Sequence, residues 1–197
     1  MESKKVFVAG CGGLGCYIVE MLVRLGVGTV RVADGDVFSE SNMNRQLYCT
    51  PDVLGKSKAV QAKLRWPEQV EAFHRFVGPE NVSMLLSGCD LVIDALDNVE
   101  ARRLLAEAAS KAGIPLVYGA IGEKNAQACV LYPGDEDIID ILYPAEVQKY
   151  RTYSYVPAFC ASLQVSLAHR ILSGDRPEAR TLLIADLDDV CLQAVKL

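Results

Sequence analysis

Two cationic side chains, Arg45 and Lys58, stand out in this sequence because together they could neutralise a polyphosphate. Arg45 offers a planar fork of N–H donors, and Lys58 offers a compact point charge. Two such cations within reach of one loop suit a triphosphate better than the singly charged phosphates of NAD. For the lysine, the alternative is a solvated basic face, since Lys56 and two further cations share the helix expected near residues 57–65.

A glycine-rich loop precedes these cations. The strand-like run Val6–Ala9 leads directly into the letters GCGGLG, in which Gly10, Gly12 and Gly15 fit the dinucleotide-binding fingerprint. Such glycines permit a tight turn and let a phosphate approach the N–H groups at the start of the next helix. Because the loop follows a strand and opens a helix, we favour nucleotide binding over a turn that only packs the helix on the strand.

Two acids, Asp34 and Asp36, follow the β-branched run Thr29–Ala33. Asp34 stands where an acid commonly accepts hydrogen bonds from ribose hydroxyls. Asp36 either assists it or holds the loop. We predict that one of the pair binds the ribose, with solvated loop acids as the alternative.

Two further polar residues, Asp97 and Asn98, follow the apolar run Leu91–Ala95. In an open α/β sheet, ligands bind beyond the carboxyl ends of the strands. Asp97 is therefore expected to hold Mg²⁺ against a phosphate. Asn98 either contacts the ligand or caps the helix that follows.

The elements that must position these residues alternate along the first two thirds of the chain. The expected strands are Val6–Ala9, Thr29–Ala33, Leu91–Ala95 and Pro115–Ala120, and the expected helices are Leu14–Leu25 and Glu100–Ala112. The run at 91–95 lacks polar alternation, as expected of a strand covered on both faces. We predict an α/β fold, a Rossmann-like, open and mostly parallel sheet with helices on both faces.

The last third of the chain predicts antiparallel additions to this sheet. Gln127–Tyr132 alternates polar and apolar residues, which indicates an added antiparallel strand. Thr181–Ala185 and Val190–Lys196 predict a closing hairpin, and Phe159–Leu172 has helical spacing. The intervening segment Pro133–Tyr155 is loop-rich and acidic and contains several tyrosines.

Composition indicates a single domain spanning residues 1–197, since a chain that is 51% hydrophobic can bury one sizeable core. A net charge of −5 and a pI near 5.1 argue against binding to nucleic acid or to an anionic membrane. No apolar run approaches the ~18 residues of a membrane span. The seven cysteines include no Cys-x-x-Cys pair, so we expect neither zinc nor a disulfide framework. With no signal-peptide pattern, we predict a cytoplasmic protein.

Four motifs occur in a distinctive order, namely GCGGLG, ADGDVFSESNMNRQ, GKSK and DALDN. Together they resemble the adenylating domain of the ThiF/MoeB/HesA family, relatives of the ubiquitin-activating enzymes. The resemblance runs from Val6 to the strand near Gly119. It resumes at Pro157–Gly174, where residues 162–164 (SLQ) resemble the family's Ser-Leu-Gln helix start. The compact, zinc-less build is closest to the short ThiF-like proteins.

Members of that family adenylate the C-terminal carboxylate of a small ubiquitin-like protein ending in Gly-Gly, with release of pyrophosphate. The resemblance implies the same reaction here, with ATP and Mg²⁺ as cofactors, a sulfur-carrier protein as partner, a pathway such as thiamine biosynthesis, and a homodimer. The attacking carboxylate is already ionised, so no general base is needed. Arg45 and Lys58 would stabilise the transition state, and Asp97 would hold the metal.

The residues and the resemblance together define a set of site residues. The predicted catalytic residues are Arg45, Lys58 and Asp97, of which Asp97 is the metal ligand. The predicted nucleotide-binding residues are Gly10, Gly12, Gly13, Gly15, Asp34, Asp36, Ser41, Asn42, Arg45, Gln46, Lys58 and Asn98. Lys58 is the lysine of the family's Gly-x-x-Lys motif, and Lys56 is a neighbour that the motif does not use.

The chain departs from the family's pattern in three respects. It starts immediately before its first strand, whereas many members have preceding helices that supply an arginine to the partner subunit's active site. The Cys-x-x-Cys zinc motifs of several members are missing. The segment Gly134–Pro157, near where some relatives carry a reactive cysteine, contains none, and Cys160 is expected in the core at a helix start. We therefore expect the adenylate to pass to a separate sulfur donor or acceptor.

Three other functions remain open. The missing zinc motif and the loop Tyr143–Tyr155 leave room for a small-molecule carboxylate as the substrate. An NAD-dependent oxidoreductase would explain the glycine loop and Asp34 but leaves the cations without a role. It also lacks an obvious catalytic histidine, since His74 sits in a strand-like run and His169 in a terminal helix. The third is a scaffold that binds ATP without catalysis.

Overall fold

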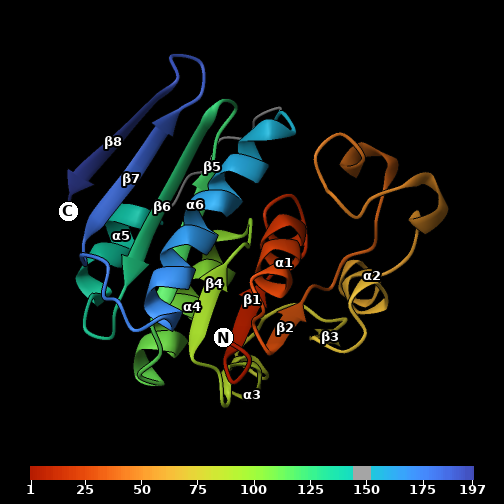
Figure 1. The fold of residues 1–197 in the computed structure, drawn as a ribbon, viewed down its shortest axis with the longest axis horizontal. Coiled ribbons are helices and arrows are strands. Elements are labelled where there is room, and N and C mark those ends of the chain that lie inside the picture. The colour runs from red at the N-terminus through yellow and green to blue at the C-terminus, as the bar shows by residue number, and fades with distance from the viewer. Residues whose placement is uncertain (144–151) are drawn as a thin grey trace.

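The computed structural model describes residues 1–143 and 152–197, in which eight strands form one sheet (Figure 1). Their order across the sheet is β3 (Val70–Phe73), β2 (Thr29–Ala33), β1 (Lys5–Ala9), β4 (Leu91–Asp94), β5 (Leu116–Ile121), β6 (Asn125–Leu131), β7 (Thr181–Asp186) and β8 (Cys191–Lys196). The first five in this order are parallel to one another, and β6, β7 and β8 are each antiparallel to the strand before them. The structure confirms the predicted α/β fold with antiparallel additions in the C-terminal third.

Helices cover both faces of this sheet. The helices of the described residues are α1 (Gly15–Arg24), α2 (Lys58–Arg65), α3 (Val82–Leu86), α4 (Val99–Lys111), α5 (Ile139–Leu142) and α6 (Tyr155–Leu172), with 3₁₀ turns η1 (Glu40–Asn42), η2 (Pro51–Val53) and η3 (Glu136–Ile138). Helices α1 and α6 lie side by side on the face toward the viewer in Figure 1, and α4 and α5 lie behind the sheet. Within residues 1–143 and 152–197, no helix has the length and apolar character of a membrane span.

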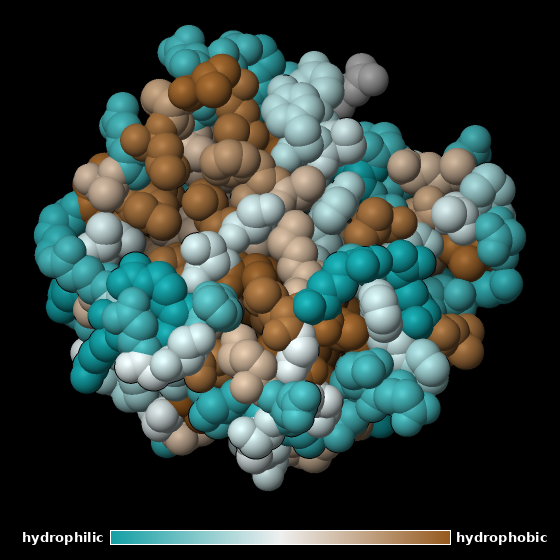
Figure 2. Space-filling view, in the orientation of Figure 1, coloured by the Kyte–Doolittle hydropathy of each residue, from teal (hydrophilic) through white to brown (hydrophobic). Residues whose placement is uncertain are grey.

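The outer strands of the sheet extend beyond these helices. Helix α6 packs on β5 and β6, and β7 and β8 continue past it. Leu192 and Val195 of β8 are therefore exposed, and apolar side chains gather over this edge of the sheet (Figure 2).

Two segments differ from their predictions. Helix α6 begins at Tyr155 rather than Phe159, because Pro157 falls in its first turn, where no intrahelical N–H bond is lost. Residues 162–164 therefore lie inside the helix and are not a helix start. The predicted loop Pro133–Tyr155 contains η3 and α5, and its part at 144–151 lies outside the described residues.

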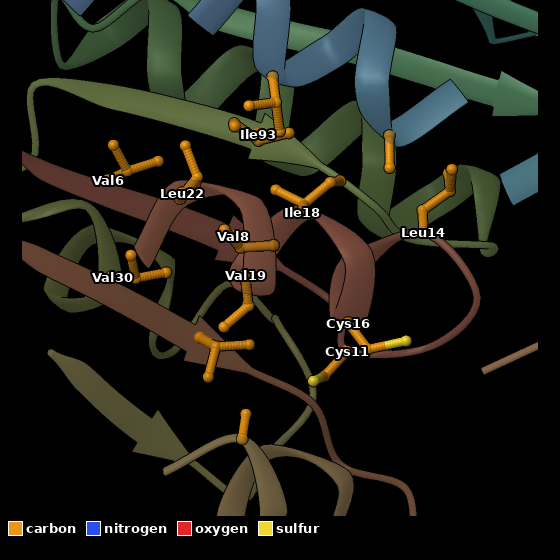
Figure 3. Close-up of a cluster of buried hydrophobic side chains, with 14 of the residues drawn as sticks. Val6, Val8, Cys11, Leu14, Cys16, Ile18, Val19, Leu22, Val30 and Ile93 are labelled. Atoms are coloured by element: carbon orange, nitrogen blue, oxygen red, sulfur yellow. The ribbon is translucent and has the colours of Figure 1, made fainter. Parts of the chain in front are cut away.

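A hydrophobic cluster fixes α1 against the central strands (Figure 3). Val6 and Val8 of β1, Ile93 of β4, and Ile18 and Leu22 of α1 are all fully buried within it. Burial of each such side chain contributes about 1.5–3 kcal/mol. Because α1 begins where the glycine loop ends, this packing sets the position of the loop.

A carboxylate in the core joins α1 to α2. Glu20 of α1 accepts hydrogen bonds from Nε of Arg65 (2.7 Å), Nε1 of Trp66 (3.0 Å) and the hydroxyl of Tyr48 (3.2 Å), and it pairs with Arg24 one turn further on. Burial by itself raises the pKa of this carboxyl. The bonds from Arg65, Arg24 and Trp66 outweigh burial and lower the pKa from its ordinary 4.5 to about 2.

We expect Glu20→Gln to lower the free energy of unfolding at pH 7 by about 1–3 kcal/mol, because it removes several hydrogen bonds to a charged group. The pKa of Glu20 is lower in the folded than in the unfolded chain. Its contribution is therefore complete above about pH 4.5 and is lost as the pH falls toward 2. Urea unfolding of both proteins at several pH values should show the difference shrinking over that range. A constant difference from pH 7 to pH 3 would contradict the charge-based explanation.

Candidate active site

The glycine loop connects β1 to α1 and has no room for side chains at its two ends. Gly10 has a φ of +94°, in the left-handed region, and a Cβ atom there would lie 2.6 Å from the carbonyl oxygen of Ala95. A Cβ atom at Gly15 would overlap the carbonyl oxygen of Gly10. Gly12 and Gly13 are half-buried and have only ordinary van der Waals neighbours. The middle of the loop is therefore the part that can admit a ligand.

Asp34 follows β2 and fastens the glycine loop to the next loop. Its Oδ2 accepts the N–H of Cys11 (2.7 Å), and its Oδ1 accepts the N–H of Asp36 (2.8 Å). Burial raises the pKa of this carboxyl, and the two hydrogen bonds oppose that rise. A carboxylate can accept about four hydrogen bonds, so Asp34 retains acceptor capacity for ribose hydroxyls.

The structure distinguishes Lys58 from its neighbour Lys56. Lys58 begins α2 and is only 6% exposed, with its Nζ 3.0 Å from Oδ2 of Asp36. Its backbone N–H donates to the carbonyl of Asp36 (3.1 Å). Lys56, in contrast, is exposed. Lys58 therefore belongs to the loop of Asp36 rather than to a solvated face, and Asp36 has the loop-holding role that the sequence left open.

Arg45 extends over the glycine loop. Its Cγ lies 3.9 Å from the place of a Cβ atom at Gly13, and its Nη1 donates to the carbonyl of Ser41 (2.9 Å) and to Oδ1 of Asn44 (2.8 Å). Nε and Nη2 are not used in these two bonds and can donate to a ligand. Asn42 shapes the same loop, since its Oδ1 accepts a backbone N–H three residues earlier (3.1 Å).

Gln46 is buried beside the glycine loop and carries an unpaired polar atom. Its side chain is 6% exposed, and its Nε2 lies 3.6 Å from the place of a Cβ atom at Gly12. Among the described residues, its Oε1 has no hydrogen-bond partner. Buried polar atoms normally have partners, and a hydroxyl of a bound nucleotide or a water would satisfy this one. The unpaired oxygen, the two cations and the open middle of the loop together fit a nucleotide.

Asp97 and Asn98 lie beyond the carboxyl end of β4, and both are exposed. Oδ1 of Asn98 accepts the N–H of Ala101 (2.9 Å), so Asn98 caps α4, one of the two roles left open by the sequence. In the part of the chain that the structure describes, no three His, Cys, Asp or Glu side chains cluster as a metal site. A metal at Asp97 would thus take most of its ligands from phosphate and water, as Mg²⁺ commonly does.

The sequence analysis missed a buried ion pair next to this loop. Asp94, the last residue of β4, is fully buried and pairs with Arg102 of α4 at 2.8 Å. Asp94 also accepts the hydroxyl of Tyr143 (2.9 Å). The available signal was an aspartate that ends an apolar strand, with an arginine eight residues further on. Charges at such positions need partners when buried.

The cysteines near the glycine loop and in α6 are poorly suited to nucleophilic attack. Cys160 lies inside α6, where its Sγ donates to the carbonyl of Gln127 (3.3 Å), and burial raises the pKa of its thiol to about 12. Burial also raises the pKa of Cys11 and Cys16. Of the seven cysteines, all within the described residues, only Cys191 is exposed. The prediction that Cys160 belongs to the core is confirmed.

A sequence model of the ThiF family matches residues 1–197. The SAMP-activating enzyme E1 of Haloferax volcanii is 39% identical over 66% of this chain and 50% of its own length. The sulfur carrier protein adenylyltransferase of Thermus thermophilus is 32% identical over 94% of this chain and 76% of its own length. The sulfur carrier protein ThiS adenylyltransferase of Bacillus subtilis is 34% identical over 74% of this chain and 45% of its own length. This chain spans about half the length of two of these three relatives.

Solved structures share the architecture. PaaA superposes with a TM-score of 0.83 at 22% identity, over 99% of this chain and 64% of PaaA. MccB of E. coli, solved with ATP, superposes with a TM-score of 0.79 at 18% identity, also over 99% of this chain and 64% of MccB. At these identities the similarity establishes the fold alone.

Proposed function

Because this chain belongs to the ThiF family, we propose that it uses ATP to adenylate the C-terminal carboxylate of a small ubiquitin-like sulfur-carrier protein. The observation that carries the proposal is the placement of two cations near one glycine loop, which suits a triphosphate: Arg45 lies over the loop, and Lys58 begins α2 and pairs with Asp36. Two of the relatives above are named as adenylyltransferases of sulfur carrier proteins, and the third as a SAMP-activating enzyme. These names support a protein carboxylate as the substrate.

The proposed reaction needs positioning and charge stabilisation. An oxygen of the substrate carboxylate forms a bond to the α-phosphorus of ATP, and the bond from that phosphorus to the bridging oxygen breaks, so pyrophosphate leaves. The carboxylate is ionised at neutral pH, so no residue has to remove a proton. Arg45 and Lys58 would stabilise the charge that develops on the phosphate oxygens. Asp97 would hold Mg²⁺, which supplies further positive charge when bound.

The surrounding residues have supporting roles in this proposal. Asp34 would accept hydrogen bonds from the ribose, and the glycine loop would admit the phosphates to the start of α1. Asp36 compensates the charge of the nearly buried Lys58 before a phosphate arrives, since the two form an ion pair. Ser41 and Asn42 would line the site from the loop that carries Arg45.

The fate of the adenylate belongs to the same proposal. The burial of Cys160 and the raised pKa of its thiol support transfer to a separate sulfur donor or acceptor rather than a thioester on this residue. The homodimer, the Gly-Gly end of the carrier, the absence of zinc and the cytoplasmic location stay predictions.

Calorimetric titration with Mg-ATP, NAD⁺ and NADH tests the choice of nucleotide. We expect Mg-ATP to bind and neither nicotinamide nucleotide to bind, because Arg45 and Lys58 together match a triphosphate. Binding of NADH without binding of ATP would replace the proposal with the oxidoreductase.

Exchange of labelled pyrophosphate into ATP tests the substrate. We expect exchange to require a sulfur-carrier protein that ends in Gly-Gly, because its terminal carboxylate must form the adenylate. The matched control is the same carrier without its two terminal glycines, which should give no exchange. Exchange driven by small carboxylates would reassign the substrate, and ATP binding without any exchange would indicate a scaffold.

A further inference from the structure

A buried hydrogen-bond network lies directly behind the loop that carries Asp97. Oδ2 of Asp94 accepts two bonds, from Nε of Arg102 (2.8 Å) and from the hydroxyl of Tyr143 (2.9 Å). The guanidinium of Arg102 packs against two tyrosine rings, 4.9 Å from the centroid of Tyr118 and 4.8 Å from that of Tyr143, and the two rings also contact each other edge to face. Asp94 is fully buried, and Tyr143 is 1% exposed. The network is therefore shielded from water.

The other carboxylate oxygen of Asp94 bonds to the backbone beside the candidate active site. Its Oδ1 accepts the N–H of Leu96 (3.1 Å), the residue before Asp97. The carbonyl oxygen of Ala95 lies 2.6 Å from the place of a Cβ atom at Gly10, so this short backbone stretch packs directly on the glycine loop. The side chain of Asp94 thus holds the backbone that leads to Asp97 against the glycine loop.

Tyr143 comes from a distant part of the chain and is held from two sides. Its backbone N–H donates to the carbonyl of Ile139 (2.9 Å), and its carbonyl accepts a hydrogen bond from Arg103 of α4. Burial raises the pKa of its hydroxyl well above the ordinary value, so the phenol keeps its proton and stays a donor to Asp94 at neutral pH. The proposed chemistry uses neither Tyr143 nor Asp94.

We propose that Tyr143 is a positioning residue for the nucleotide site. Its hydroxyl fixes the orientation of the Asp94 carboxylate, and Asp94 in turn fixes the backbone at 95–96, which places Asp97 beside the glycine loop. The inference rests on the proposed function, because it requires a nucleotide and a metal at this site.

Calorimetric titration with ATP, once with Mg²⁺ and once with EDTA, tests the inference on Tyr143→Phe. We expect the wild-type chain to bind ATP more tightly with Mg²⁺. In Tyr143→Phe this advantage of the metal should fall about three- to tenfold, as one lost hydrogen bond allows. Hydrogen exchange gives a second readout without nucleotide, since the N–H of Leu96 should exchange about three- to tenfold faster once Asp94 is less well held.

Tyr118→Phe is the matched control. Tyr118 is equally buried and packs on the same guanidinium, but its hydroxyl bonds to the carbonyl of Leu142 (3.1 Å) and to Gln127 (3.3 Å) instead of Asp94. We expect Mg²⁺ to strengthen ATP binding to Tyr118→Phe as much as it does in the wild-type chain. The N–H of Leu96 should also exchange at the wild-type rate.

The outcomes separate the inference from the proposed function. Equal effects in the two variants, or none in Tyr143→Phe, would reduce Tyr143 to a packing residue and overturn the inference. A wild-type chain that binds no ATP would remove the proposed function and the inference with it. If Tyr143→Phe is unfolded at the assay temperature while Tyr118→Phe is folded, both measurements are repeated on the two variants at a lower temperature, where Tyr143→Phe is folded. Leu96 exchange and a Mg²⁺ advantage that are the same there in Tyr143→Phe and in the wild-type chain would overturn the inference.

Discussion

Replacing Lys58 with alanine is expected to lower the rate of pyrophosphate release about 10²–10³-fold, the usual loss for one charged contact to a transition state. The lysine is nearly buried, and its ammonium lies 3.0 Å from Asp36 in the loop after β2. Its position is thus fixed before any phosphate arrives. Steady-state kinetics with Mg-ATP and the carrier protein measure the change, which should fall mainly on kcat. Arg45→Ala is expected to give a loss of the same order.

The neighbouring Lys56 supplies the control for this experiment. It has the same charge, lies two residues away and is exposed to solvent. Lys56→Ala should therefore leave kcat within about twofold, since an exposed charge is screened by water and salt. Near-normal turnover in Lys58→Ala, or equal losses in both variants, would mean that Lys58 has no specific role in the reaction.

The second large effect concerns stability. Asp94→Ala is expected to lower the free energy of unfolding by about 3–5 kcal/mol, because it leaves the guanidinium of Arg102 buried without a compensating charge. Burial by itself lowers the pKa of Arg102. Asp94 and the two neighbouring tyrosines outweigh burial and raise this pKa above its ordinary value. Because an arginine guanidinium stays protonated in proteins, Arg102 would keep its charge in the variant without Asp94. Urea unfolding followed by circular dichroism measures the loss.

A double variant separates the charge from the packing at this position. Asp94→Ala combined with Arg102→Met removes both charges, so we expect part of the lost stability to return. Two outcomes would show that Asp94 and Arg102 are not coupled. The first is a loss of unfolding free energy of less than about 1 kcal/mol in Asp94→Ala. The second is a loss in the double variant that equals the sum of the losses in the two single variants.

The central sheet was predictable because its strands are apolar runs that end at glycine or aspartate. Strand β2 spans Thr29–Ala33 as predicted, and the closing hairpin of β7 and β8 lies where it was predicted, at Thr181–Ala185 and Val190–Lys196. A strand-like run was recognised around His74, next to β3 (Val70–Phe73), but it was not given a place in the sheet. Helix α3 (Val82–Leu86) was not assigned, since such a short segment holds too few residues for a periodic pattern. Their structure depends on packing against the rest of the sheet.

The residues of the candidate site were predicted from the sequence motifs, but the burial and contacts of their side chains were not. The resemblance to the family's Gly-x-x-Lys motif singled out Lys58 over Lys56, yet only the fold shows that Lys58 is buried against Asp36 and Lys56 is exposed. The contact of Tyr143 with Asp94 joins two segments whose separation carries no periodic signal. Such pairings arise when distant elements pack together, which a single sequence does not encode locally.

The place of β1 in the sheet has a consequence for how the chain folds during synthesis. Val6 pairs with Val30 of β2 on one side and with Leu91 of β4 on the other. The first pairing can form early, whereas the second must wait for β4 to emerge and must close a long loop. Until then one edge of β1 presents unpaired N–H and C=O groups beside apolar side chains, a template for association between nascent chains. In the folded protein, the central position of β1 supports the glycine loop. In the partly synthesised chain, the same strand has an unpaired edge.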